Sequence, residues 1–174
     1  YEKTWQRSRR QFGSDHPDTL MSMHNLASSY AALGRHAEAL RILEEALERM
    51  RAKLGPDHPA LLDTMHNLAS CYKALGRVAD AVKVREELLA RLKAKLGDVH
   101  PRVAGCTYAI ACLQAQMIKG AENPGQQADL AMDWLRRAVA AGYRDARQMM
   151  ADLDLAVLHG RPDFKKLLAD LEKK

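Results

Sequence analysis

Seven histidines are the residues of this sequence with the widest chemical range, because imidazole binds metals and transfers protons. Zinc sites place their ligands at i,i+4 or short-loop spacing. His16, His58 and His100 instead each precede a proline, 42 residues apart, without a partner ligand at such a spacing. The sequence therefore predicts no metal site, and these histidines are expected at the starts of helices.

The three cysteines, Cys71, Cys106 and Cys112, form no CxxC pair. They lie among small apolar residues and are predicted to be buried, reduced thiols, which indicates a cytoplasmic-type compartment. The sequence shows no glycine-rich phosphate loop and no nucleophile motif. We therefore expect neither an enzyme nor a cofactor or small-molecule substrate. No apolar run is long enough for a membrane span, so no membrane contact is expected.

A 42-residue repeat determines the elements that position these side chains. The blocks Gly13–Pro17, Met23–Ser28 and Leu33–Arg35 return at Gly55–Pro59, Met65–Ser70 and Leu75–Arg77. Within one copy, apolar residues recur at helical spacing. They predict one helix from Pro17 to about Leu33 and a second from about His36 to Leu54. Proline suits the first helical turn, and Gly34 and Gly55 are expected to end the two helices.

Composition agrees with a helical fold. Hydrophobic residues make up 47% of the chain but aromatic ones only 5%, so alanine, leucine and methionine must fill the core. Ala27 and Ala39 are expected where two antiparallel helices approach within roughly 8–10 Å. A period of this length is typical of stacked helix pairs, which present extended binding surfaces.

The pattern Leu26-Ala27-x-x-Tyr30-x-x-Leu33-Gly34-x-x-x-x-Ala39 resembles a tetratricopeptide repeat. The period and the Asp-His-Pro, Asn-Leu-Ala and Leu-Gly-Arg blocks are similar to the kinesin-light-chain type. The resemblance implies an all-α, right-handed solenoid of antiparallel helix pairs with a C-terminal helical cap. Its expected parts are the second helix of a truncated repeat (1–12), repeat 1 (13–54), repeat 2 (55–96), a divergent repeat 3 with a longer loop (97–142) and the cap (143–174).

Both ends of the chain depart from the regular repeat. Residues 1–12 align with a second helix without its first-helix partner, so Trp5 and Phe12 are expected to be partly uncovered and could pair two copies. In the third unit, Pro101–Lys119 is the expected first helix. Short helices are expected at Asp145–Asp152, near Leu155–Leu158 and at Asp163–Lys173; their capping role fits the terminal unit of a solenoid.

On a tetratricopeptide-like first helix, the resemblance implies a concave groove that binds peptides. The candidate groove residues are Met21, His24, Asn25, Ser28 and Ala31 in repeat 1, and Asp63, His66, Asn67, Ser70 and Lys73 in repeat 2. Asn25 and Asn67 match the groove asparagine of the kinesin-light-chain type, while Ala109 does not. Asparagine amides can hold a peptide backbone, or they can bridge adjacent helices. Both interpretations remain open at this point.

Basic residues cluster on the second helices and predict a basic ridge: Arg7, Arg9, Arg10, Arg49, Arg51, Lys53, Arg91, Lys93 and Lys95. A solvated helix face explains them better than nucleic-acid binding, because no aromatic residues are interleaved for stacking. The predicted function is therefore a protein–protein interaction module that binds an extended peptide or a helical segment. The alternative is an architectural or autoregulatory arm of a larger protein, such as a bacterial kinase; nucleic-acid binding is a weaker alternative.

Overall fold

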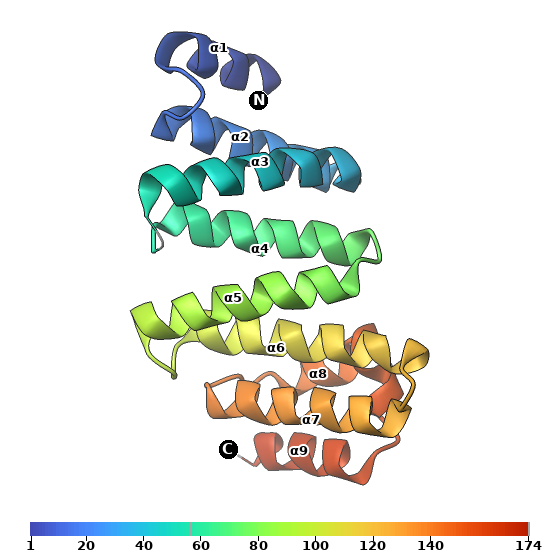
Figure 1. The fold of residues 1–174 in the computed structure, drawn as a ribbon. Coiled ribbons are helices and arrows are strands. Elements are labelled where there is room, and N and C mark those ends of the chain that lie inside the picture. Colours follow the sequence, from blue (N-terminus) through green and yellow to red (C-terminus); the bar gives the residue numbers. More distant parts are fainter. Residues whose placement is uncertain (56, 174) are drawn as a thin grey trace. The chain divides into compact units, whose positions relative to one another are not determined.

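The computed structural model describes residues 1–55 and 57–173. Pro56, which belongs to the second Gly-x-Asp-His-Pro block, and Lys174 lie outside the described residues. All regular structure in the described part is helical, which confirms the predicted all-α class (Figure 1). The chain divides into two compact units, Tyr1–Arg91 and Leu92–Lys174, and each is described by itself.

Unit 1 consists of helices that pack on their sequence neighbours and run antiparallel to them (Figure 1). They are α1 (Glu2–Phe12), α2 (Pro17–Ala32), α3 (His36–Leu54), α4 (Pro59–Ala74) and the greater part of α5 (Val78–Leu96). The bounds of α2 and α3 agree with those predicted from the repeat. Leu20, Leu43, Met50, Leu61 and Met65 are completely buried and form part of the core of this unit.

The three His-Pro pairs at His16, His58 and His100 begin helices, as predicted, and the histidine itself is the cap. The Nδ1 atoms of His16, His58 and His100 accept hydrogen bonds from the backbone N–H groups two residues later, at 3.2, 3.2 and 3.1 Å. An imidazole here satisfies a free N–H of the first turn, as an asparagine or aspartate side chain does elsewhere. The periodic histidines are therefore explained by helix capping.

The Leu-Gly-Arg blocks form the turns between paired helices. Gly34 and Gly76 have φ values of +75° and +73°, in the left-handed region that favours glycine. After each glycine, the arginine side chain lies over a tyrosine of the preceding helix: Arg35 over Tyr30 at 4.3 Å, and Arg77 over Tyr72 at 4.5 Å. This cation–π contact, together with the glycine, explains why the block returns in both copies.

Helix α1 partly fits the expectation for an uncovered second helix. Phe12 is 44% exposed and stacks on the His16 ring at 4.7 Å. Trp5 is half-buried, with the Arg9 guanidinium 5.8 Å from its ring centre. No residue of α1 is fully buried. Association of two copies through this helix stays a prediction.

Unit 2 has two long antiparallel helices and a tail of short ones. They are α6 (Pro101–Gln116), η1 (Met117–Gly120), α7 (Pro124–Ala140), α8 (Ala146–Ala151), η2 (Leu153–Leu158) and α9 (Pro162–Glu172). The predicted first helix ended at Lys119. In the structure α6 ends three residues earlier, and the chain continues as a 3₁₀ turn, a common way for a helix to end.

The tail helices are confirmed within a few residues, and side chains explain their starts. Asp145 caps α8 by accepting from the Gln148 N–H at 2.8 Å, and Asp152 caps η2 by accepting from the Asp154 N–H at 3.0 Å. Met149, Leu155, Leu158 and Phe164 are completely buried in one cluster with apolar residues of α6 and α7. The tail therefore packs against the apolar side of α6 and α7. The three cysteines are buried and form no disulfide with one another, as predicted.

Candidate functional site on the first helices

The ten candidate groove residues all reach the surface of unit 1. Met21, Asn25, Asp63, His66, Ser70 and Lys73 are exposed, and His24, Ser28, Ala31 and Asn67 are half-buried. The 42-residue register places them at matching positions of α2 and α4, which contact each other. The candidate site is therefore one polar face shared by these two helices, here called the α2/α4 face.

Hydrogen bonds across the repeats connect the two helices of this face. His24 Nδ1 lies 3.0 Å from Thr64 Oγ1, and Asn67 Nδ2 donates to Ser28 Oγ at 3.0 Å. Ser28 in turn donates to the His24 carbonyl oxygen at 2.9 Å. The Asn67 amide therefore bridges adjacent helices through its nitrogen, as one of the two interpretations held. A side-chain amide has a separate oxygen that accepts hydrogen bonds, so this bridge and peptide binding are compatible.

Asn25 differs from Asn67 although both occupy the same repeat position. Its side chain is exposed and makes no hydrogen bond within the part of the chain that the structure describes. Its carbonyl oxygen accepts from Ser29 Oγ at 2.9 Å, which is a contact within α2. The Asn25 amide thus has both its donors and its acceptor available to a partner.

His24 is expected to make the free energy of unfolding depend on pH. Burial lowers the pKa of His24, and the charge of Asp63 opposes that shift. Thr64 donates its hydroxyl proton to the Ala60 carbonyl oxygen at 2.7 Å, so the His24 Nδ1 must donate to Thr64. The ring is therefore neutral near pH 7, with the proton on Nδ1 and the Nε2 lone pair free to accept.

We expect the free energy of unfolding to fall as the pH is lowered from 7.5 towards 5.5. The unfolded His24, with a pKa of about 6.5, binds a proton before the folded one does, which favours the unfolded state. Urea titrations at several pH values measure this, with His24→Gln as the control. A variant with an equally steep dependence between pH 7.5 and 5.5 would show that His24 is not the responsible group.

Arg85 of α5 is a residue of this site that the sequence analysis missed. It is only 7% exposed, and its guanidinium lies 2.9 Å from His66 Nδ1 and donates to Ser70 Oγ at 3.2 Å. The equivalent residue of repeat 1 is Leu43, a core residue. An arginine at the repeat position where the other copy has a buried leucine was the sequence signal that could have identified Arg85. Its effect is to place a positive charge beneath two of the predicted groove side chains.

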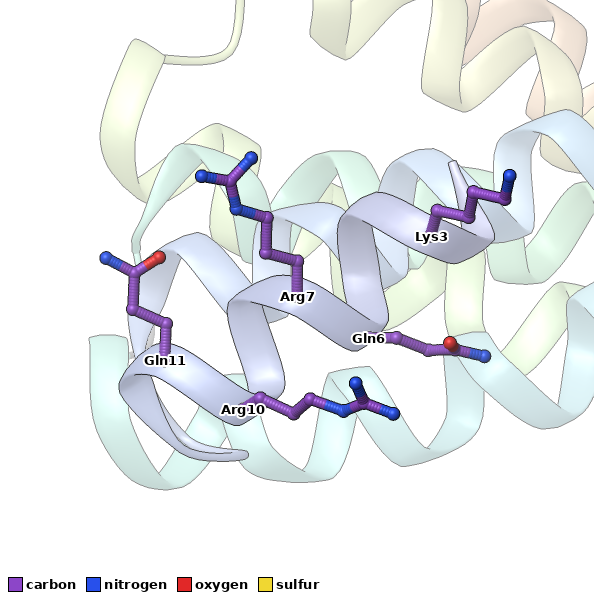
Figure 2. Close-up of a pocket in the computed structure, with 5 residues that line it drawn as sticks. All are labelled: Lys3, Gln6, Arg7, Arg10 and Gln11. Carbon is purple, nitrogen blue, oxygen red and sulfur yellow. The ribbon is translucent and has the colours of Figure 1, made fainter.

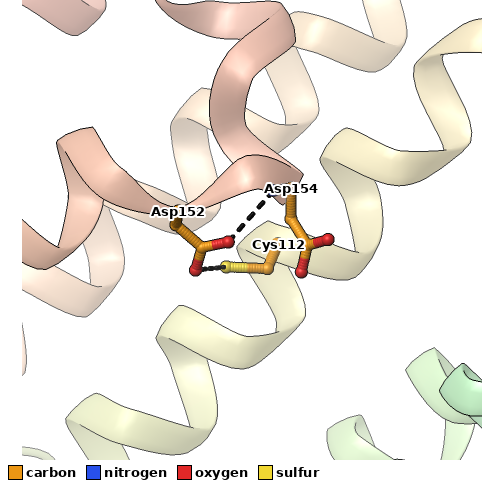
Figure 3. A group of neighbouring side chains, drawn as sticks. All are labelled: Cys112, Asp152 and Asp154. Atoms are coloured by element: carbon orange, nitrogen blue, oxygen red, sulfur yellow. Dashed lines mark hydrogen bonds between the residues drawn. The ribbon is translucent and has the colours of Figure 1, made fainter.

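In unit 2 the corresponding face of α6 is occupied by the tail. Tyr108 and Cys112 stand 42 residues after His66 and Ser70. The Tyr108 hydroxyl donates to Asp152 Oδ2 at 2.7 Å, and Cys112 Sγ lies 3.5 Å from the same oxygen (Figure 3). One turn further, Gln116 Nε2 donates to Asp154 Oδ1 at 2.6 Å.

Cys112, Asp152 and Asp154 come close enough to hold a metal ion, but their bonding argues against one. Burial raises the pKa of Cys112, and the Asp152 charge raises it further, so the sulfur stays a neutral thiol rather than a metal-binding thiolate. The two oxygens of Asp152 accept from Tyr108, Cys112 and the Asp154 N–H. The group is a hydrogen-bonded contact between the tail and α6.

Ion pairs in the structure join at least four of the nine residues of the predicted basic ridge to carboxylates. The pairs are Arg49 with Asp15 (2.9 Å) and Glu45 (2.8 Å), Arg51 and Arg91 with Glu87 (2.6 and 2.9 Å), and, in unit 2, Lys93 with Asp98 (3.0 Å). Such exposed pairs contribute little stability, but they cancel the field that a nucleic acid needs. This favours the solvated-face interpretation.

Within the described residues, Lys3, Arg7 and Arg10 of helix α1 form no salt bridge. Lys3, Gln6, Arg7, Arg10 and Gln11 border a space of about 440 Å³ (Figure 2). All five are exposed and extend outwards from a single helix, with no second element opposite them in the lining. The space therefore lies between extended surface side chains and does not form a built binding site.

These features define the chain as a helical repeat protein with a polar inter-helix face. A family model described as Tetratricopeptide repeat matches residues 1–52 and 22–94, more than half of the chain. The chain belongs to the tetratricopeptide repeat family, which confirms the resemblance. Repeats of this family serve generally in protein–protein interaction. None of the described helices is both long and apolar enough to cross a membrane.

Solved structures agree with this assignment. A protein of Podosopora anserina with nearly identical kinesin light chain TPR-like repeats matches with a TM-score of 0.78 and 25% identity, over 99% of this chain and 82% of that one. A single-substitution variant of it matches with a TM-score of 0.77. BtubC (BKLC) from P. vanneervenii shares the fold at 21% identity and a TM-score of 0.67, over 90% and 61%. A search of curated proteins found no match.

Proposed function

We propose that this chain binds an extended peptide or a helical segment of a protein partner against the α2/α4 face. The observation that carries the proposal is in unit 2, where the equivalent positions of α6 hold a chain segment, Asp152–Leu158, through side-chain hydrogen bonds. The same repeat positions on α2 and α4 carry polar side chains at the surface. A repeat face that binds a segment in one copy is suited to bind one in the others.

The polar groups of the face support binding of a backbone. Asn25 offers donors and an acceptor, and His24 offers the neutral Nε2 acceptor. Hydrogen bonds from such side chains recognise peptide groups in any sequence context. Met21, which is 43% exposed, adds an adaptable apolar contact. Because a short peptide loses conformational freedom on binding, we expect micromolar affinity.

A peptide-display selection against the purified chain tests this proposal. We expect an enriched peptide whose affinity falls about fivefold in Asn25→Ala, the effect of one lost hydrogen bond. Asn25 is a clean probe because its side chain holds no other part of the chain, whereas Asn67→Ala also breaks the bond to Ser28. Glu48→Ala, an exposed position on α3, is the matched control and should bind normally.

Two results would contradict the proposal. One is a selection without enrichment; the other is an enriched peptide that binds Asn25→Ala and a Met21→Ser variant as tightly as the unaltered chain. Loss of binding in Glu48→Ala would instead place the contact on the second helices. Nucleic-acid binding has less support, because Arg49, Arg51 and Arg91 of the basic ridge are paired with carboxylates and no aromatic residues are interleaved for stacking.

A further inference from the structure

The segment Asp152–Leu158, here called the tail segment, packs on α6 through one of its sides. Leu155 and Leu158 are completely buried in the cluster that includes Tyr108 and Cys112. Leu153 and Val157 point away from it and are 88% and 43% exposed. The segment thus has one apolar side that anchors it and one side that stays in solvent, as a bound amphipathic peptide has.

Polar contacts fix the register of the tail segment on α6. Asp152 accepts from Tyr108 and Cys112, and Asp154 accepts from Gln116, so three side chains spaced four residues apart on α6 hold two carboxylates. Burial, with the nearby Cys112 and Asp152, raises the pKa of Tyr108, which keeps its hydroxyl protonated as a donor. The three donors occupy the repeat positions that His66, Ser70 and Ala74 occupy in repeat 2.

The tail segment has little internal structure to hold it in place. Six of its residues, Leu153–Leu158, form the 3₁₀ helix η2, a conformation with poor hydrogen-bond geometry that is seldom long. A cavity of about 450 Å³ lies along one edge, lined by Gln116 and Lys119 on one side and by Leu153, Ala156 and Val157 on the other. Side-chain contacts with α6 and the cluster around it, rather than a continuous helix, therefore determine where the segment lies.

We propose that the tail segment is a ligand in cis: it occupies on α6 the repeat face that the proposed function assigns to an external peptide on α2 and α4. Repeat 3 is thereby closed to external peptides, and a partner engages the first two repeats only. This inference rests on the proposed function for the peptide-binding role of the face. The contacts between the tail segment and α6 are independent of it.

Native-state hydrogen exchange of the full chain tests whether the segment docks as a unit. The reporters are the amides of Leu155 and His159, which bond to Asp152 and Ala156 carbonyl oxygens. We expect them to exchange by local release, faster than the amides of α6 and α7. Tyr108→Phe removes a hydrogen bond to a carboxylate and should speed their exchange about tenfold, leaving α7 unchanged.

Tyr143→Phe is the matched control. Tyr143 stacks on Tyr108 at 4.2 Å, but its hydroxyl donates to Gln148 and not to the tail segment. Its removal should leave the two reporter amides unchanged. If Leu155 and His159 exchange together with α6 and α7, or if Tyr108→Phe speeds all of them equally, the segment is an integral core element and the proposal is wrong.

A labelled synthetic peptide of residues 150–160 provides a second readout. Asp152→Ala removes the carboxylate that two α6 side chains bond, so the site opens and the peptide should bind this variant at least about tenfold more tightly than the unaltered chain. Equal affinity for both would overturn occupation in cis. If the display selection fails but the peptide still binds Asp152→Ala more tightly, only the proposed peptide binding by the α2/α4 face is wrong. The two proposals can therefore fail separately.

Discussion

Replacing Phe164 with alanine is expected to lower the free energy of unfolding of unit 2 by about 3–5 kcal/mol, the range for deleting a buried aromatic side chain. Phe164 has no exposed surface, and its ring stacks on His159 at 5.4 Å. It lies in the same cluster as Leu155 and Leu158, so its loss opens a cavity beside the tail segment. Urea denaturation followed by circular dichroism measures the change.

Phe12→Ala is the matched control, because the chain has only these two phenylalanines. Phe12 is 44% exposed, so its removal creates no closed cavity, and we expect a loss below about 1 kcal/mol. Similar losses in the two variants would mean that the tail does not complete a tightly packed core.

Ala27→Leu is expected to destabilise unit 1 by about 1–3 kcal/mol through overpacking. Ala27 and Ala39 both have no exposed surface, on helices α2 and α3 that pack against each other. A leucine has no room there without a shift of the backbone or of neighbouring side chains. Thermal and urea denaturation both report the effect.

An exposed alanine on the same helix pair provides the comparison. Ala37→Leu on α3 faces solvent, and its stability should stay within about 0.5 kcal/mol of the unaltered chain. If Ala27→Leu melts at an unchanged temperature, the close helix approach inferred for this position is wrong.

Much of the fold could be predicted from local sequence. Pro17 and Gly34 bound α2 to within two residues because proline and glycine act on the backbone where they stand. The helix ends in the third unit were less accurate. Nothing local to Lys119 shows that α6 ends at Gln116, because the 3₁₀ turn depends on how the chain enters α7.

The repeat register predicted that Asn25 and Asn67 occupy matching surface positions, but it did not predict their bonding. The two amides differ, since only Asn67 meets Ser28 of the previous repeat. Arg85 was missed because helical spacing marks its position as core, where an arginine needs partners that only the folded chain supplies.

The sequence by itself determined the repeat, the helix starts and the pairing of neighbouring helices, because these depend on residues within a few positions of one another. Histidine caps, for example, join atoms two residues apart. Only the tertiary structure decided which side chains meet across repeats. His24 and Thr64 are 40 residues apart, and Tyr108 and Asp152 are 44. Contacts at such separations depend on how helices stack, and a pattern of residue types along the chain does not specify which of several polar partners each side chain will reach.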